Sequence, residues 1–178
     1  MMPYSQNIAM ALLVGMVLAG VYTDLTRGKI YNKLTIPCIA AGLLLGGIGA
    51  GADGLLTSLN GLVVASLSVI LFLTSQMIGG GDAKLLLAVG ALMGPGFALY
   101  TLLYTALAGG AIAIMAVARR KILGATIRGF GNGLLYAVVY RTPVVLNSGP
   151  RAGHIPYSLA IAAGVAIAMA TSHVQAIG

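Results

Sequence analysis

The sequence predicts an all-α membrane protein of about six transmembrane helices, with the N-terminus outside and an additional interfacial segment in the cytoplasm. Hydrophobic residues make up 59% of the 178 residues and charged residues only 7%, whereas an ordinary globular domain has roughly 25% charged residues. The apolar residues gather in runs of the length that helices need in a bilayer. Every Lys and Arg falls between these runs or, in the case of Lys84, at the start of one, and all of them lie on one side of the membrane if the runs cross it in turn.

Six apolar runs supply the expected helices. They cover residues 8–22, 34–50, 59–78, 83–93, 97–118 and 155–171. A turn is expected at 51–57, and a break at 94–96 closes the fourth run, which is shorter than the ~20 residues of a spanning helix. Gly and Ala recur in the runs, and in lipid such small residues let helices approach closely. We expect one domain, residues 1–178, in which 122–153 form a cytoplasmic loop with an interfacial amphipathic helix.

The basic residues predict the orientation of these helices. With the N-terminus outside, the inner loops are residues 24–33, 79–84 and 119–153. All ten Lys and Arg fall in these loops, as the positive-inside rule requires. The same topology places Asp24 and Asp82 on the cytoplasmic side and Asp53 on the opposite side. The net charge of +7 is therefore explained by orientation in the membrane, and no nucleic-acid partner is expected.

Carboxylates are scarce in this chain, which contains three Asp and no Glu. Two of them on one membrane surface suggest an aspartyl peptidase, in which an ionised carboxylate takes a proton from water while a protonated one stabilises the oxyanion. Asp82 follows three glycines at the start of a helix, where the positive end of the helix dipole favours the ionised form. Lys84 would add to this effect if it points the same way. Asp24 closes the first helix, where charge is disfavoured, so Asp82 is the expected base and Asp24 its protonated partner.

Each of these residues also has a purely structural interpretation. Asp82 can be only the N-cap of a helix. Asp24 can be an interfacial charge paired with Arg27 or Lys29. The glycines at 79–81 can form a simple loop, or they can allow a substrate backbone to approach closely.

Three other residues are assigned structural roles. Cys38 is the single cysteine, so it can form neither an internal disulfide nor a multi-cysteine metal site, and no metal or other cofactor is expected. Asp53 lies in a Gly-rich segment and fits a turn or a cap. Tyr157, taken alone, fits an aromatic anchor at the membrane interface.

The segments around the two carboxylates resemble the type IV prepilin peptidases, a family of GxGD intramembrane aspartyl proteases. The GxGD signature is Gly79-Gly80-Gly81-Asp82, and it continues as Ala83-Lys84-Leu85-Leu86 in the form found in this family. Asp24, followed by Arg27 and Ile30-Tyr31-Asn32, resembles the first catalytic block, in which a Pro usually stands where this chain has Tyr31.

The opening of the last helix of that family also has a counterpart. Ile155-Pro156-Tyr157 and Ala160-Ile161-Ala162 resemble its Pro-Tyr-Gly-Pro-Ala-Ile-Ala segment, from which Ser158 and Leu159 depart. The resemblance covers nearly the whole chain and implies that Asp24 and Asp82 are catalytic, with the glycines 79–81 as a substrate-approach loop. The candidate supporting residues are Arg27, Asn32, Lys84, Pro156 and Tyr157.

The resemblance is to the short members of the family, such as those that serve tight-adherence (Flp-type) pili. Larger members carry a loop with two CxxC pairs, linked to zinc and to N-methylation, and this chain has one Cys. The resemblance therefore implies a peptidase without methyltransferase activity or cofactor. It would cut the leader of prepilins at the cytoplasmic face of the inner membrane. Because that leader and the inner loops are both basic, recognition is expected to rest on the apolar pilin helix, surrounded by lipid, and on backbone contacts.

Three alternatives stay open at this point. An archaeal-type preflagellin peptidase belongs to the same class. A small proton- or cation-coupled transporter component would use Asp24 and Asp82 as ion sites, although both lie on one side of the expected membrane. A structural assembly subunit would need neither carboxylate for chemistry.

Overall fold

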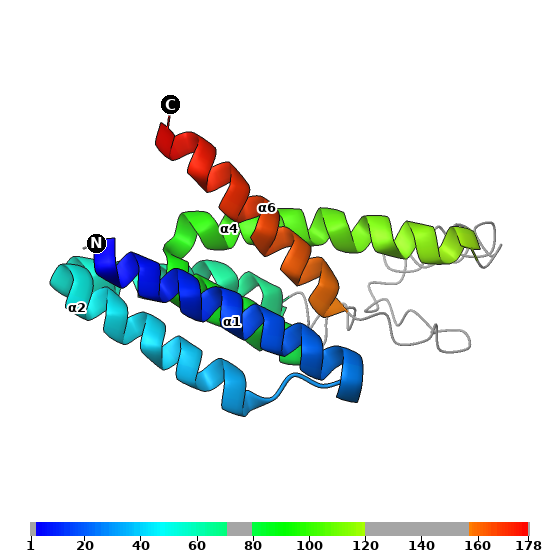
Figure 1. The fold of residues 1–178 in the computed structure, drawn as a ribbon, viewed down its shortest axis with the longest axis horizontal. Helices are drawn as coiled ribbons and strands as arrows, with labels where there is room; N and C mark the ends of the chain where they lie inside the picture. Colours follow the sequence, from blue (N-terminus) through cyan, green and yellow to red (C-terminus); the bar gives the residue numbers. More distant parts are fainter. Residues whose placement is uncertain (1–2, 71–79, 120–156, 178) are drawn as a thin grey trace, which may run out of the picture.

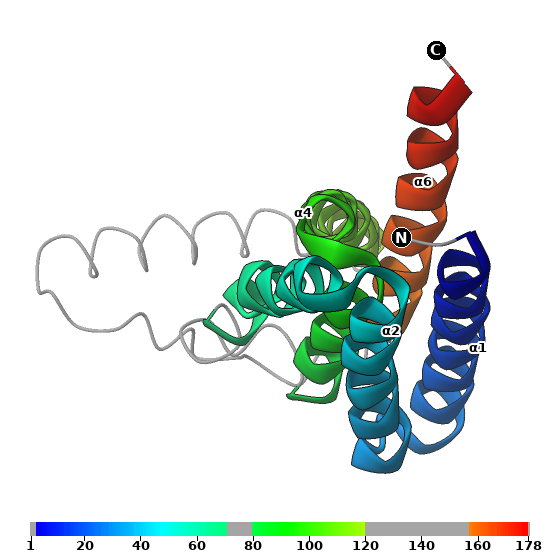
Figure 2. The same cartoon turned by 90° about the vertical axis from the view of Figure 1, so that its left-hand side faces the viewer.

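The computed structural model describes residues 3–70, 80–119 and 157–177, and the regular elements in these ranges are all helices. They are α1 (Pro3–Arg27), α2 (Asn32–Ala65), α4 (Gly80–Arg119) and α6 (Tyr157–Ile177) (Figure 1). α4 contacts each of the other three helices, and α1 also contacts α2 and α6; Figure 2 shows α1 and α6 beside each other at the right-hand side of the molecule. The predicted all-α class is confirmed.

The basic loop predicted at residues 24–33 is shorter than expected, because α1 continues to Arg27 and α2 already starts at Asn32. Gly28 ends α1 with a φ of 62°, and its N–H donates to the carbonyl oxygen of Asp24 at 2.8 Å. This is the usual left-handed glycine cap of a helix C-terminus. Asp24 consequently lies in the last helical turn and not in a loop.

α2 turns back on itself. Its backbone leaves the helical region at Ala50 and Gly51, where the φ of Gly51 is 60°, a conformation that glycine adopts at little cost. Beyond this bend, Ser58 Oγ donates to the carbonyl oxygen of Gly42 at 3.2 Å, although a straight helix would separate these residues by about 24 Å. The two arms of α2 therefore pack against each other. The turn predicted at 51–57 is wrong in extent, because two residues suffice for the bend and the helix resumes directly.

α4 bends in a similar way at the position predicted for the end of the fourth apolar run. Gly94 has non-helical dihedral angles, and Pro95 follows as the first residue of the second arm, where its missing N–H costs little. Figure 1 shows the two arms of α4 running in different directions from this bend. The predicted break at 94–96 is thus confirmed as a sharp bend inside one element.

Small residues bring the helix backbones into contact, as the sequence predicts. A Cβ at Gly42 in α2 would lie 2.6 Å from the carbonyl carbon of Ala91 in α4. A Cβ at Gly164 in α6 would lie 2.8 Å from the backbone nitrogen of Thr105 in α4. The hydrophobic core fills the space between α1, α4 and α6, and its largest fully buried members are Leu13, Met16, Leu85, Leu92 and Ile161.

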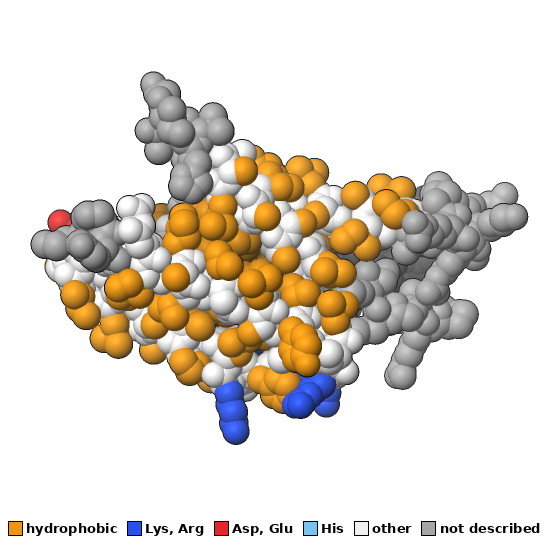
Figure 3. Space-filling model, viewed as in Figure 1, with side chains coloured by type: hydrophobic (Ala, Val, Ile, Leu, Met, Phe, Trp, Pro, Cys, Tyr) orange, Lys and Arg blue, Asp and Glu red, His pale blue; other side chains and the backbone are white. Residues whose placement is uncertain are grey.

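Within the described ranges, three helical segments are long and apolar enough to cross a membrane: Ser5–Arg27, Asn32–Ile70 and Gly80–Ile112. Tyr157–Thr171 is a shorter apolar helix. Apolar side chains cover much of the outer surface (Figure 3), which identifies a membrane protein. The six-crossing topology stays a prediction. The interfacial segment predicted at 122–153 lies outside the described residues.

Candidate active site

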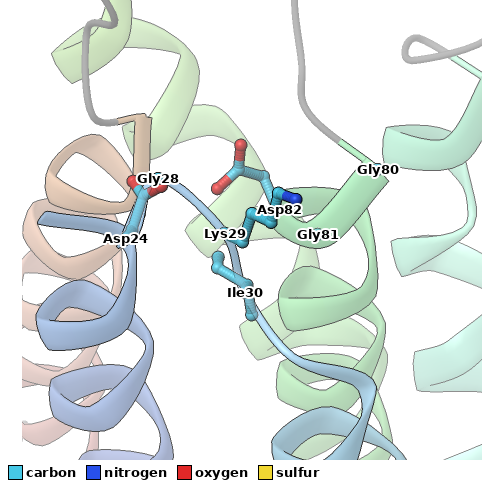
Figure 4. A pocket seen from close by; sticks show the side chains of 7 residues that line it. All are labelled: Asp24, Gly28, Lys29, Ile30, Gly80, Gly81 and Asp82. Carbon is cyan, nitrogen blue, oxygen red and sulfur yellow. The ribbon is translucent and has the colours of Figure 1, made fainter. Parts of the chain in front are cut away.

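A pocket of about 300 Å³ lies where the last turn of α1, the linker to α2 and the first turn of α4 meet (Figure 4). It is lined by Asp24, Gly28, Lys29, Ile30, Gly80, Gly81 and Asp82. Two carboxylates from distant parts of the sequence therefore share one pocket. This is the juxtaposition that the charge distribution of the sequence predicts.

Asp24 is buried between two helix ends. Its side chain is 5% exposed, and its Oδ2 accepts a hydrogen bond from Ser158 Oγ at 2.6 Å. Ser158 is the second residue of α6 and is fully buried. Asp24 thus belongs to the C-terminal turn of α1 and at the same time lies against the N-terminal turn of α6.

Asp82 lies in the first turn of α4, where the sequence places it, and is 9% exposed. Its carboxylate extends from α4 toward the side of the pocket on which Asp24 lies (Figure 4). Both carboxylates therefore meet the N-terminus of a helix, α4 for Asp82 and α6 for Asp24. The sequence analysis assigned Asp82 as the base because it considered only the C-terminal end of α1 for Asp24. With the N-terminus of α6 also beside Asp24, helix ends no longer indicate which of the two carboxylates is ionised.

Tyr157, which the sequence suggests as a supporting residue, is brought close to the carboxylates. Its phenol group lies near Asp82. Its ring packs on Gly109 in the second arm of α4, where a Cβ would lie 2.9 Å from a ring carbon. Tyr157 therefore connects the first turn of α6 to both arms of α4.

Gly81, directly before Asp82, packs against the α1–α2 linker of the same chain. A Cβ at Gly81 would lie 2.9 Å from the Cβ of Ile30, so the missing side chain lets the α1–α2 linker pack directly on the start of α4. The sequence predicts that these glycines accommodate a substrate backbone, but at Gly81 the neighbouring backbone is that of the linker. Gly80 lines the pocket, and Gly79 lies outside the described residues.

The two basic candidates are hydrogen-bonded to other polar side chains around the pocket. Lys84 Nζ donates to Asn32 Oδ1 at 2.8 Å, which ties the first turn of α4 to the first residue of α2. Arg27 donates to the Tyr31 hydroxyl at 3.3 Å, and its guanidinium lies 5.8 Å from the centre of that ring. These hydrogen bonds stabilise the position of the linker, which forms one wall of the pocket. The remaining candidate, Pro156, lies outside the described residues.

Two contributors to the site were not among the residues singled out from the sequence. Ser158 was noticed only as a departure from the last family segment. Its one signal is that it is a hydroxyl group at the start of an apolar run. Lys29, considered only as a partner of Asp24, lines the pocket itself. In the described ranges, no group of three or more His, Cys, Asp or Glu side chains could hold a metal ion.

Comparison with known proteins gives one result that bears on this pocket. A family model described as the type IV leader peptidase family matches residues 11–114. The matched range covers more than half of the chain and contains Asp24 and Asp82, whereas Ser158 lies beyond it. No curated protein and no solved structure matches the chain.

Proposed function

The chain belongs to the type IV leader peptidase family, and on this premise we propose that it is an aspartyl endopeptidase of Flp-type prepilins. The family indicates a leader-peptidase type of protease and, in general, a prepilin substrate. The observation that carries the aspartyl mechanism is the pair of buried carboxylates, Asp24 and Asp82, in the walls of one pocket.

Two carboxylates in one pocket can hydrolyse a peptide bond without a covalent intermediate. The ionised member takes a proton from a water molecule as the water oxygen attacks the scissile carbonyl, and the protonated member hydrogen-bonds the carbonyl oxygen. Collapse of the tetrahedral intermediate breaks the C–N bond, and a carboxyl group returns a proton to the departing amine. Partial burial of the pair strengthens its interaction with the developing charge, because water screens it less.

The substrate would present its hydrophobic N-terminal helix to the exposed apolar faces of the bundle. Its leader would then reach the pocket beside the linker at 28–31. The basic side chains around this end, Lys29 and Lys84 among them, would not attract a basic leader, so the apolar helix and the backbone supply recognition. The sequence contains no CxxC pair, which supports a peptidase without methyltransferase activity.

We place the pocket at the cytoplasmic face of the inner membrane, in a six-crossing topology with the N-terminus outside. The bends of α2 and α4 support this topology, because they divide each helix into two arms. On the face drawn in Figure 3, the visible Lys and Arg side chains lie at the lower edge, and an acidic side chain lies at the left edge, away from them. The described basic side chains of the pocket end are Arg27, Lys29, Lys33 and Lys84.

Labelling of single cysteines tests this orientation. Lys33 at the start of α2 and Ala52 just after its bend are both exposed. In a Cys38→Ala background, an impermeant thiol reagent is expected to label Ala52→Cys from the periplasmic side of spheroplasts. The same reagent should label Lys33→Cys only after the membrane is opened. The reverse pattern would contradict the proposed orientation.

Co-expression with a prepilin tests the activity. The chain, expressed with the product of a neighbouring pilin gene in cells that lack other prepilin peptidases, is expected to convert the precursor into the shorter mature form. An unprocessed precursor, in the presence of stably inserted protein, would contradict the proposal. Ion flux through liposomes that depends on Asp24 and Asp82 would favour the transporter alternative instead.

Replacement of Gly81 by Ala is expected to reduce cleavage strongly while the protein stays inserted. The new Cβ would lie 2.9 Å from the Cβ of Ile30, a branched atom that cannot rotate away, so the linker must shift and carry Asp24 away from Asp82. Misplacement of catalytic groups by about 1 Å can cost on the order of 10²-fold in rate. Gly15→Ala in α1 is the control, because no atom lies within 4 Å of its added Cβ. Equal rates for both variants would show that the linker does not position the pair.

A further inference from the structure

Ser158 makes a contact with Asp24 that the mechanism above does not use. Its hydroxyl donates to Asp24 Oδ2 at 2.6 Å, a short hydrogen bond between two side chains from distant parts of the sequence. The serine is 0% exposed and Asp24 5% exposed, so little water competes for the bond. A donor in this position favours the charged form of the carboxylate.

The placement of α6 acts in the same direction. Ser158 is the second residue of α6, so the Asp24 carboxylate lies beside the first turn of that helix. Backbone N–H groups and the positive end of the helix dipole are concentrated there, and they stabilise negative charge. This contribution opposes that of the C-terminal turn of α1, to which Asp24 itself belongs. Asp82 in the first turn of α4 gains the same kind of stabilisation, so helix ends alone do not choose between the carboxylates and the assignment rests on the Ser158 contact.

We propose that Ser158 is a positioning residue that holds Asp24 ionised and in one orientation, so that Asp24 is the general base. Asp82 is then the protonated partner, because two like charges that share a pocket disfavour each other. This assignment reverses the one expected from the sequence, and it rests on the proposed peptidase function. In the first step a water O–H proton moves to Asp24 while the Asp82 proton moves to the scissile carbonyl oxygen. As the C–N bond breaks, Asp24 returns its proton to the amine, and Asp82 regains one from a hydroxyl group of the intermediate.

The charged and titratable groups around the pair are compatible with this division. Lys29 reaches the pocket from the linker and adds positive charge beside the pair, which favours one ionised carboxylate without selecting which of the two it is. Arg27, on the same helix as Asp24, donates to Tyr31. On α6, Tyr157 lies near Asp82, and its phenol is neutral at ordinary pH, so it adds no charge to the pair.

The kinetic test compares four forms of the purified protein in liposomes with a prepilin substrate: the unchanged chain, Ser158→Ala, Ser158→Thr and Ser58→Ala. We expect kcat to fall about tenfold in Ser158→Ala with KM unchanged, because the lost bond acts on the reacting carboxylate and not on substrate binding. Ser158→Thr keeps the hydroxyl and should retain most of kcat. Ser58→Ala is the matched control, since it removes a buried serine bond between the two arms of α2 and Ser58 does not line the pocket.

Infrared spectra test the protonation states separately. At neutral pH, the band of a protonated carboxyl group is expected in the unchanged chain, because the two carboxylates share one proton, and it should be lost in both Asp24→Asn and Asp82→Asn, in which no second charge opposes ionisation. A band that remains in Asp82→Asn would show that Asp24 is the protonated member and would overturn the assignment, as would absence of the band from the unchanged chain. This measurement also applies if Ser158→Thr does not fold.

The failures of the two proposals are distinguishable. If Asp24→Asn is inactive but Ser158→Ala keeps the full kcat, Ser158 has no positioning role and the peptidase function stands. The positioning role is also overturned if folded Ser158→Thr is as slow as Ser158→Ala, or if Ser158→Ala raises KM alone. If the unchanged chain does not cleave, the proposed function itself fails.

Discussion

Replacement of Asp24 or Asp82 by Asn is expected to lower prepilin cleavage by on the order of 10³-fold or more, since each variant loses one of the two proton-transferring groups. Asn has nearly the size of Asp, so the packing around the buried pair should survive, and at position 24 its carbonyl oxygen can still accept the bond from Ser158. The rate of appearance of the mature pilin, measured in liposomes at equal protein content, gives the effect.

Asp53→Asn is the matched control for both variants. Asp53 is exposed and lies just beyond the bend of α2, far from the pocket. Its replacement should leave the rate within about twofold of the unchanged chain, because surface substitutions away from structural features have small effects. Full processing by either Asp24→Asn or Asp82→Asn would exclude an aspartyl mechanism at this pocket.

Replacement of Gly61 by Ala is expected to destabilise the whole bundle. The added Cβ would collide with the carbonyl oxygen of Gly90 in α4 and lie 2.9 Å from the carbonyl carbon of Gly94. Both obstacles are backbone, so the helices themselves must separate. Overpacking costs ~1–3 kcal/mol, which for a chain of this size lowers Tm by roughly 2–12 °C. Thermal unfolding in detergent, followed by circular dichroism or by loss of monodisperse protein, measures the change.

Gly47→Ala in the same helix separates this clash from the general effect of a glycine replacement. No atom lies within 4 Å of a Cβ at Gly47, and Ala stabilises a helix by up to ~1 kcal/mol relative to Gly. This variant should therefore be at least as stable as the unchanged chain. If Gly61→Ala unfolds at the same temperature as Gly47→Ala, α2 and α4 do not pack in the way described.

The sequence predicts those features that depend on local composition. Apolar runs, small residues and the glycines before Asp82 define the helices, their close packing and the start of α4. The distribution of Lys and Arg brings Asp24 and Asp82 to one surface. For the same reason the breaks at Gly51 and Gly94 are recognisable, since glycine and proline interrupt an otherwise helical pattern.

The remaining features depend on which helices pack together, and periodicity does not encode this. Ser158 and Asp24 are separated by 134 positions, and their contact exists only because α6 packs beside the end of α1. Gly81 contacts Ile30 because the linker crosses the start of α4. The prediction for Asp24 considered only the C-terminal end of α1. It therefore omitted the N-terminus of α6, which also lies beside the Asp24 carboxylate.

The central claim is that this chain alone, through Asp24 and Asp82, hydrolyses the leader of a prepilin. The most direct measurement is mass spectrometry of a prepilin incubated in liposomes with the purified chain, beside the Asp24→Asn/Asp82→Asn double variant. The account predicts a product shortened by the leader with the unchanged chain and only the intact precursor with the double variant. An intact precursor in both samples, or the shortened product in both, would contradict it.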